Sequence, residues 1–362
     1  MNICIISPYP PQSGGVPIHT ESLVKHLSKE HKVFLITYGR FGRHSHGNVK
    51  IIEVPIIDVK FLRGLSFFLG AFFRLRGLVK HEKIDVIHSQ FMHPPGTVGS
   101  FYRWFHGKKP RFVVTAHGSD LLSLAQGRIG RSIIKCVGKR CDRLICVSEY
   151  LSKEAQKLGI SRKKTTLIYN GLEDRGLPKA SKESLRKVLN LPDRKIVTFS
   201  GKLSEAKGAD IFLILAEHFA RKGDVHFILV GDGPARDDLE GFCKKMAITK
   251  SVSFVGEKSH QDSLKYMKAS DVVVVPSRIE GFGLTALEAM RMGVPVIAFP
   301  NGALPEIMPD IAVTENMPHT VKKIIESRKF REALVKRNRE ASKKFTLEKM
   351  FDETDRIYKK RL

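Results

Sequence analysis

The sequence predicts an α/β protein with two successive domains, each built on a doubly wound parallel sheet. At 362 residues the chain is long enough for two separate hydrophobic cores. Short apolar segments alternate with helical patterns in the first half, and the same alternation starts again after Leu191. An Asn-Gly turn at Asn170 and Gly171, followed by polar residues, separates the two halves. We therefore expect one domain over residues 1–170 and a second over residues 171–345.

The expected strands are short apolar runs that each end at a turn. In the first domain they are residues 3–7, 32–37, 49–54, 86–88, 112–116, 143–147 and 165–168. In the second domain they are residues 196–200, 226–230, 252–255, 272–275 and 295–298. Doubly wound sheets bind ligands outside the carboxyl ends of their strands, so functional residues are expected in the turns that follow these runs.

The net charge of +25 is the main anomaly of the composition. The first 170 residues hold 27 Lys and Arg against 10 Asp and Glu, so +17 of this charge lies in the first domain. Such a field favours an anionic partner, for which a phospholipid surface or a polyanionic acceptor is suitable. Nucleic acid is not expected, because no nucleic-acid module is recognisable. A plain solvated basic surface is the alternative.

Several sequence features point to a cytoplasmic protein. No run of about eighteen uncharged apolar residues occurs, and the first expected strand begins too early for a signal peptide. The five cysteines lack the paired spacing of a zinc site and are expected to be reduced thiols. No Asp-x-Asp sequence occurs, so we expect no metal ion and no cofactor.

Two hydrophobic segments of the first domain are candidates for contact with a membrane. Residues 61–80 predict a helix with phenylalanine and leucine on all sides and several basic residues, which suits a membrane interface. The alternative is a buried crossover helix between two strands. In the second segment Phe101, Tyr102, Trp104 and Phe105 lie among cations, a combination that suits a headgroup boundary. The protein could therefore be peripheral on the inner face of the cell membrane.

The most informative segment is residues 277–288, in which two glutamates enclose a glycine-flanked turn. The apolar run 272–275 predicts a buried strand, so Glu280 would lie on the loop after it. Glu288 would lie about one turn inside the following helix. Two carboxylates placed in this way suit the hydroxyls on either side of a phosphate. The alternative is a helix-capping loop with a surface glutamate.

The turn between these glutamates is suited to binding phosphate. Its glycines allow a sharp bend, and the amides of residues 283–285 would be unpaired donors at a helix start. The residues of this turn expected to contact substrate are Gly281, Phe282, Gly283, Leu284 and Thr285.

Three further segments place chemistry at the ends of expected strands. Lys202 and Lys207, after Gly201, are two cations spaced to reach one diphosphate, where they would stabilise leaving-group charge. Gly14 and Gly15 form a loop that allows close approach of a ligand, or a turn that only starts a helix. His117 follows a strand at the sheet edge, where a polar residue is expected to be functional, although a lone histidine is more often structural. Two further candidates for contact with substrate are Asp120, three residues after His117, and Val255, at the end of another expected strand.

The Glu-Gly-Phe-Gly-Leu segment, with a second Glu eight positions after the first, closely resembles the retaining glycosyltransferases of family 4. The resemblance extends over nearly the whole chain. It implies the GT-B fold, two Rossmann-like domains facing each other across a cleft. The second domain would hold a nucleotide diphosphate sugar and the first would admit the acceptor. In this family the last helix, here residues 346–362, crosses back to pack on the first domain.

The resemblance also implies roles for individual residues. Glu280 would hold sugar hydroxyls, Glu288 the ribose, and Thr285 with its neighbours the terminal phosphate. His117 would contact the donor sugar and Asp120 would lie near the acceptor. The family usually has arginine where Lys202 stands, so either the donor geometry differs here or Lys207 carries more of the diphosphate charge.

We therefore expect a retaining, metal-independent hexosyltransferase that moves a sugar from UDP- or GDP-sugar to a hydroxyl, with a lipid-linked or cell-envelope glycan as acceptor. Alternatives are a phosphorylase or nucleotide-sugar epimerase on the same fold. A protein that only binds nucleotide sugars or anionic surfaces is a third class.

Overall fold

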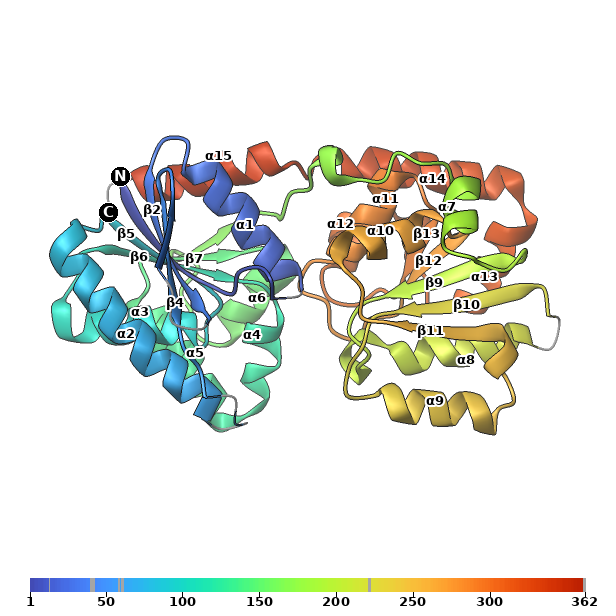
Figure 1. Ribbon diagram of the computed structural model, residues 1–362, viewed down its shortest axis with the longest axis horizontal. Coiled ribbons are helices and arrows are strands. Elements are labelled where there is room, and N and C mark those ends of the chain that lie inside the picture. Colours follow the sequence, from blue (N-terminus) through green and yellow to red (C-terminus); the bar gives the residue numbers. More distant parts are fainter. Residues whose placement is uncertain (13, 40–42, 58, 60–61, 221–222, 361–362) are drawn as a thin grey trace. The chain divides into compact units, whose positions relative to one another are not determined.

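The chain folds into two compact units, which we describe separately. The computed structural model describes residues 1–12, 14–39, 43–57, 59, 62–220 and 223–360. Unit 1 comprises Met1–Tyr169 and Glu348–Leu362, and unit 2 comprises Asn170–Leu347. In both units strands and helices alternate along the chain (Figure 1), so the predicted α/β class is confirmed.

Unit 1 is built on an eight-stranded sheet with the strand order β3-β4-β2-β1-β5-β6-β7-β8. The strands are β1 (Asn2–Ile6), β2 (Lys32–Tyr38), β3 (Arg43–His46), β4 (Val49–Val54), β5 (Val86–Gln90), β6 (Arg111–Ala116), β7 (Arg143–Cys146) and β8 (Thr165–Leu167). Neighbouring strands are parallel except β3 and β4. Strand β3 was not predicted, because its sequence Arg-His-Ser-His has no apolar alternation.

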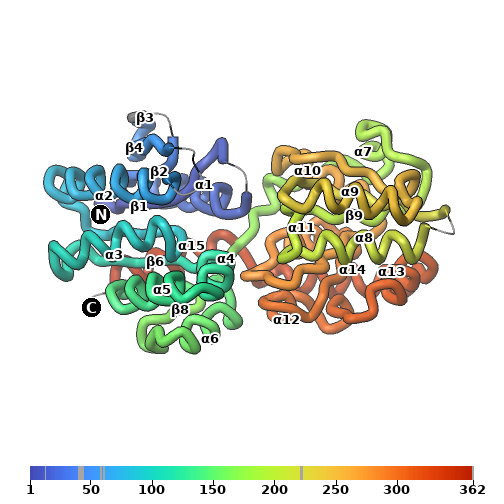
Figure 2. The backbone as a smooth tube through the Cα atoms, turned by 90° about the horizontal axis from the view of Figure 1, so that it is seen from below, coloured from blue at the N-terminus to red at the C-terminus, as the bar shows by residue number. Residues whose placement is uncertain are grey.

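Helices cover both faces of this sheet. They are α1 (Gly15–Leu27), α2 (Leu62–Glu82), α3 (Pro95–His106), α4 (Ser119–Leu122), α5 (Arg128–Arg140), α6 (Glu149–Lys157) and α15 (Leu347–Lys359). Helices α2, α3 and α5 lie side by side on one face (Figure 2), and α1 and α15 lie on the other. Phe351 of α15 stacks on His26 of α1, so the last helix packs on unit 1. Residues 361–362 of the expected last helix lie outside the described residues.

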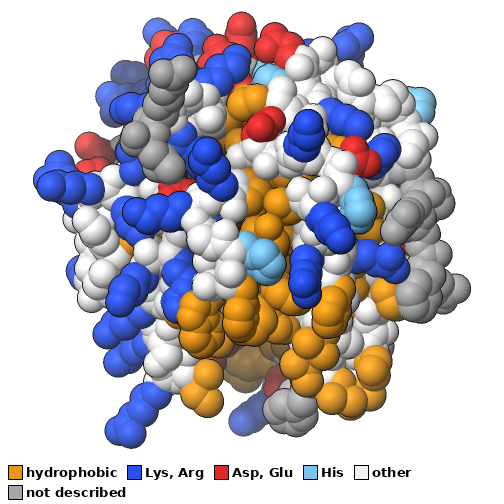
Figure 3. Space-filling model, turned by 90° about the vertical axis from the view of Figure 1, so that its left-hand side faces the viewer, with side chains coloured by type: hydrophobic (Ala, Val, Ile, Leu, Met, Phe, Trp, Pro, Cys, Tyr) orange, Lys and Arg blue, Asp and Glu red, His pale blue; other side chains and the backbone are white. Residues whose placement is uncertain are grey.

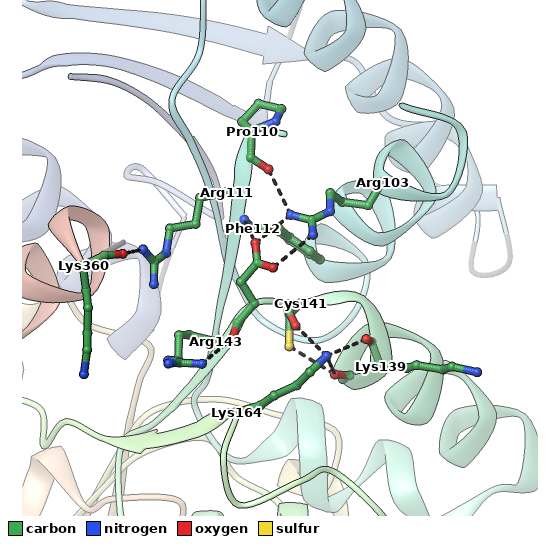
Figure 4. Close-up of polar contacts among 11 residues, drawn as sticks. Arg103, Pro110, Arg111, Phe112, Lys139, Cys141, Arg143, Lys164 and Lys360 are labelled. Carbon is green, nitrogen blue, oxygen red and sulfur yellow. Dashed lines mark hydrogen bonds and ion pairs between the residues drawn. The ribbon is translucent and has the colours of Figure 1, made fainter. Parts of the chain in front are cut away.

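A largely buried ion pair fixes α3 to the sheet (Figure 4). The Arg103 guanidinium donates to both carboxylate oxygens of Asp142, at 2.6 and 3.0 Å, and also to the carbonyl of Pro110. Asp142 accepts a further bond from the amide of Phe112 at the start of β6. Both charged side chains are at most 10% exposed, so loss of either partner would leave an uncompensated buried charge. The outer surface of α3 is therefore held in a fixed position.

Unit 2 has a five-stranded parallel sheet with the order β11-β10-β9-β12-β13. The strands are β9 (Lys195–Ser200), β10 (Val225–Val230), β11 (Val252–Gly256), β12 (Val272–Val275) and β13 (Val296–Ala298). The helices are α7 (Lys182–Val188), α8 (Ala209–Ala220), α9 (Arg236–Lys245), α10 (His260–Lys268), α11 (Leu284–Met292), α12 (Leu304–Ile307), α13 (Met317–Glu326) and α14 (Arg328–Ser342). Helices α8 and α9 cover one face and α10 and α11 the other (Figure 1). The all-valine strand β12 is buried, as its sequence predicts.

Candidate active site

The loops after the central strands of unit 2 meet at the carboxyl edge of the sheet. A Cβ atom on Gly231, whose φ is +138°, would lie 2.0 Å from the carbonyl oxygen of Gly201. A Cβ atom on Gly208, with φ +71°, would lie 2.0 Å from the carbonyl oxygen of Pro276. Neither position has room for a side chain, so glycine lets these backbone segments touch. The loop that carries Lys207 is thereby brought against the loop that carries Glu280.

Glu280 and Lys207 form an ion pair at this edge. The ammonium of Lys207 lies 3.0 and 2.9 Å from the two carboxylate oxygens of Glu280, and the hydroxyl of Ser277 donates to one of them at 3.0 Å. Glu280 is buried, whereas the Lys207 side chain is 37% exposed. The pair places a fixed cation and a carboxylate with further acceptor capacity side by side.

Backbone hydrogen bonds hold the Glu280 loop in place. The amides of Arg278 and Ile279 both donate to the carbonyl of Ala206, at 2.9 and 3.0 Å. The carbonyl of Glu280 accepts from the amide of Ala303 at 3.1 Å. A carboxylate on a loop fixed from both sides is preorganised to bind a ligand.

Lys202 differs from Lys207 in its surroundings. Its side chain is exposed, and no hydrogen bond or ion pair joins it to another described residue. It could therefore meet an anion without breaking an existing contact, whereas Lys207 is already paired with Glu280.

Helix α11 begins directly after the Glu280 loop. Gly283, at φ +103°, occupies the position before the first turn, and among the described residues no side chain caps this helix start. The hydroxyl of Thr285 lies 3.5 Å from the carbonyl of Ser200 at the end of β9. The Phe282 side chain packs against Phe345 in the core, so only its backbone could meet a ligand. The five residues predicted to contact substrate here are Gly281, Phe282, Gly283, Leu284 and Thr285, and all lie on this turn.

Glu288 lies in α11 and has a histidine partner. His260, the first residue of α10, has its Nε2 2.7 Å from a carboxylate oxygen of Glu288. This hydrogen bond raises the pKa of His260 above its ordinary value, although burial opposes the change. Sequence reasoning missed His260. Ser259 and Asp262 mark the helix start, but nothing in the sequence indicates that its first residue faces Glu288.

Val255 lies on β11, at the edge of the sheet. Its side chain packs against the buried cluster of Ile196, Ile228 and Val230.

In unit 1, His117 follows β6 and contacts three side chains. Its Nε2 lies 2.7 Å from the amide oxygen of Gln90. The rings of His19 and Phe91 approach it edge-on, with centroids at 4.9 and 5.4 Å. Burial, together with His19 and His88 nearby, lowers the pKa of His117 well below its ordinary value. The imidazole is therefore neutral at physiological pH.

Asp120 is occupied by backbone amides. One of its carboxylate oxygens accepts from the amides of His117 and Gly118, at 3.0 and 2.9 Å, and the other from the amide of Met92 at 2.8 Å. Burial raises the pKa of Asp120 to about 6, against the opposing effect of these bonds. In this arrangement the carboxylate shapes the loop that carries His117.

Gly14 and Gly15 lie at the start of α1 and are exposed. Gly14 has φ +117°, and a Cβ atom there would have only Pro17 within 4 Å. Ser13, which precedes them, lies outside the described residues. Among the described residues of the whole chain, no group of three or more His, Cys, Asp and Glu side chains could hold a metal ion.

Comparison with known proteins decides the family. Residues 13–175 match the model "Glycosyltransferase Family 4", and residues 181–341 match the model "Glycosyl transferases group 1". An uncharacterized glycosyltransferase of Methanocaldococcus jannaschii is 31% identical over 366 residues, which cover 99% of this chain and 98% of the relative. The chain belongs to glycosyltransferase family 4. The family predicted from the Glu-Gly-Phe-Gly-Leu segment is thus confirmed.

Other relatives of this glycosyltransferase agree on class and fold. The N-acetyl-alpha-D-glucosaminyl L-malate synthase of Bacillus anthracis is 24% identical over 306 residues, covering 84% of this chain and 80% of that enzyme. The structure of sucrose-phosphate synthase from Thermosynechococcus elongatus matches with a TM-score of 0.85 and 22% identity, covering 99% and 98% of the two chains. HepE of Anabaena, in complex with UDP-glucose, matches with a TM-score of 0.81 and 18% identity, covering 99% of each chain. The predicted GT-B fold is confirmed.

Proposed function

We propose that this glycosyltransferase transfers a hexose from a nucleotide diphosphate sugar to a hydroxyl, with retention of anomeric configuration and without a metal ion. The observation that carries the proposal is the Glu280–Lys207 pair beside the start of α11, where no side chain of the described residues caps the helix, with Glu288 in the second turn of that helix. A carboxylate, a cation and the amides of a helix start match the hydroxyls and phosphates of such a donor. The complex of HepE with UDP-glucose supports this class of donor.

Each group has a distinct role in this proposal. Glu280 accepts hydrogen bonds from sugar hydroxyls, and Glu288, oriented by His260, binds the ribose. Lys207 and Lys202 stabilise the negative charge that accumulates on the diphosphate as the glycosidic bond breaks. In unit 2 the remaining contacts are made by the backbone at Gly201, Val255 and residues 281–285. In unit 1 the proposed backbone contacts are at Gly14 and Gly15.

Retention follows if the acceptor attacks the face from which the diphosphate leaves. The bond from the anomeric carbon to the phosphate oxygen breaks, and a bond to the acceptor oxygen forms. The acceptor proton passes to the departing phosphate oxygen. No covalent nucleophile takes part. His117 is neutral and binds a sugar hydroxyl.

Nucleotide binding tests the role of Glu288. Titration of the full chain with UDP, GDP and ADP in EDTA is expected to show binding of at least one of them. Glu288→Gln should weaken that binding about tenfold, because a hydrogen bond to a charged group contributes roughly 1.5 kcal/mol or more. Glu315→Gln, at an exposed position, is the matched control. Failure of all three nucleotides to bind, or binding abolished by EDTA, would contradict the proposal.

A basic, apolar surface of unit 1 supports a lipid-linked or envelope acceptor. Leu65, Leu69 and Phe73 of α2 and Trp104 and Phe105 of α3 are between 47% and 64% exposed. We call these five residues the aromatic face. Figure 3, which views unit 1 from the left-hand side of Figure 1, shows hydrophobic side chains gathered on its surface with Lys and Arg around them. Phe101 connects the two helices, with ring centroids 5.2 Å from Phe72 and 4.9 Å from Phe105.

The charges around the aromatic face favour an anionic partner. Helices α3 and α5 contain no Asp or Glu, and the single acid of α2, Glu82, is paired with Lys32 and Lys50. The cations of the three helices are Arg63, Arg74, Arg76, Lys80, Arg103, Arg128, Arg131, Lys135, Lys139 and Arg140. Exposed aromatics surrounded by cations without competing acids suit an anionic lipid bilayer.

The two hypotheses for residues 61–80 were a helix in a membrane interface and a buried crossover helix. The segment is the crossover helix α2 between β4 and β5, but only Phe67, Ala71 and Leu75 are buried. Phe61 lies outside the described residues. Tyr102 of the second candidate segment is buried and was wrongly placed at the surface by the sequence prediction.

No helix in the described part of the chain is long and apolar enough to cross a membrane. Peripheral attachment on the cytoplasmic side therefore belongs to this proposal, as does a lipid-linked acceptor. The matched structure of WaaG, described as involved in lipopolysaccharide biosynthesis, is consistent with such an acceptor.

Vesicle flotation tests the aromatic face. The triple variant F73S/W104S/F105S should bind vesicles of phosphatidylglycerol and phosphatidylcholine at least about 1,000-fold more weakly than the unaltered chain, because burial of each of the three aromatics contributes roughly 1.5 kcal/mol or more. Binding should also weaken steeply between about 50 mM and about 500 mM salt. The matched control is V188S/I214S, which alters two exposed apolar residues of unit 2. Equal binding by both variants, or binding that salt does not affect, would contradict membrane attachment through this face.

A further inference from the structure

Strand β5 carries polar side chains in a position where all its residues are buried. His88 and Gln90 are at most 1% exposed, and burial of such groups costs free energy unless they are hydrogen-bonded. His88 Nδ1 contacts the hydroxyl of Tyr358 in α15 at 2.5 Å, and its Nε2 contacts the hydroxyl of Thr115 at 2.7 Å. The amide nitrogen of Gln90 lies 3.3 Å from the same Nε2, and its amide oxygen lies 2.7 Å from Nε2 of His117. A series of hydrogen bonds through His88 and Gln90 thus connects Tyr358 of the last helix to His117.

The direction of each of these hydrogen bonds follows from the donors available. An amide nitrogen only donates, so Nε2 of His88 must accept from Gln90, and the proton of the neutral His88 ring must be on Nδ1. That proton is donated to the Tyr358 oxygen. At the other end, an amide oxygen only accepts, so Nε2 of His117 must carry the proton and donate it to Gln90.

Both rings are neutral, so each has a single ring proton, and the hydrogen bonds place it on Nδ1 of His88 and on Nε2 of His117. Burial lowers the pKa of His88 to about 3 and that of His117 well below its ordinary value. A neutral His117 with its proton on Nε2 has an unshared electron pair on Nδ1. This atom makes no hydrogen bond to another described residue, and the ring is partly exposed.

We propose that Gln90, held by His88 and Tyr358, fixes His117 in the Nε2–H tautomer, so that Nδ1 accepts a hydrogen bond from a hydroxyl of a substrate sugar. This inference rests on the proposed function for the identity of the ligand. Gln90, His88 and Tyr358 are positioning residues, and none of them touches the substrate in this account. The hydrogen bonds that the amides of His117 and Gly118 donate to Asp120 hold the backbone of this loop. The hydrogen bonds through Gln90 determine which ring nitrogen of His117 carries the proton.

The tautomer has a consequence for specificity. A lone pair at Nδ1 attracts a hydroxyl proton but repels a carboxylate, so the site favours a neutral sugar over a uronic acid. A ring with its proton on Nδ1 would donate instead and would favour the carboxylate. The sugar that His117 contacts is therefore expected to present a hydroxyl at this point.

The tautomer can be read directly by NMR. In the full chain labelled with ¹⁵N-histidine, the two ring nitrogens of His117 should show a protonated Nε2 and an unprotonated Nδ1 without any substrate. His117→Gln assigns the signals. A protonated Nδ1 in the unaltered chain would overturn the proposal, whatever the outcome for the nucleotide donor.

Variants of Gln90 test the positioning role. Gln90→Leu should give a mixture of His117 tautomers and lower kcat about tenfold, the loss of roughly one hydrogen bond, with little change in donor KM. Gln90→Glu keeps an acceptor for the Nε2–H of His117 but loses the donor to His88, so Nε2 of His117 should stay protonated in this variant. Gln156→Leu, a partly exposed glutamine of α6, is the matched control. If Gln90→Leu keeps the single tautomer and the kcat of this control, the proposal is wrong. Because the tautomer is measured without substrate, its failure is distinguishable from a failure to bind or transfer sugar.

Discussion

Replacement of Glu280 by glutamine is expected to lower kcat about 100-fold or more, while nucleotide affinity changes little. In our proposal the carboxylate accepts hydrogen bonds from sugar hydroxyls. Loss of one such preorganised group typically lowers kcat about 100-fold or more. Glutamine keeps the size of the side chain and its bond to Ser277 but removes the charge that Lys207 faces. Steady-state kinetics and nucleotide titration measure the two quantities separately.

The control for this variant is Glu315→Gln, which alters an exposed glutamate of the same unit. If Glu280→Gln weakened nucleotide binding by the same factor as it lowered kcat, Glu280 would be a nucleotide-binding or structural group. The assignment of Glu280 to the sugar would then be wrong.

Lys207→Met is expected to lower kcat about 100-fold and to weaken binding of nucleoside diphosphate about tenfold. The variant removes a cation that meets leaving-group charge, and it leaves the buried carboxylate of Glu280 without its partner. Lys202→Met is the matched comparison, because Lys202 is exposed and joined to no other described side chain. We expect the smaller loss there.

The double variant K207M/E280Q separates the two causes. Since the two side chains form one pair, the combined loss should be much smaller than the product of the single losses. A loss from Lys202→Met that exceeds the loss from Lys207→Met would contradict the assignment of the diphosphate charge to Lys207.

The sequence predicted the elements of the fold well because apolar runs and glycine turns are local signals. The all-valine β12 and the glycine-flanked turn before α11 lie where their sequences place them. The edge strand β3 was missed because its four polar residues pair with β4 without an apolar pattern. Helix α2 was correctly predicted, but its burial depends on which turn faces the sheet, and a helix apolar on all sides does not indicate that.

The site was less predictable where side chains converge from distant segments. His260 reaches Glu288 across 28 residues, and Tyr358 reaches His88 across 270. No local pattern reports such a pair. Asp120 illustrates the same difficulty, because its carboxylate was expected near the acceptor and is occupied by three backbone amides, one of them 28 residues away.

The most direct test of the central claim is the release of nucleoside diphosphate from a panel of UDP-, GDP- and ADP-sugars, with and without a lipid extract of the source cells. We expect release from one donor that rises with the extract, persists in EDTA and is lost in Glu280→Gln. Release from none of these donors, in a chain that binds no nucleotide either, would contradict the assignment of a nucleotide-sugar donor to this glycosyltransferase.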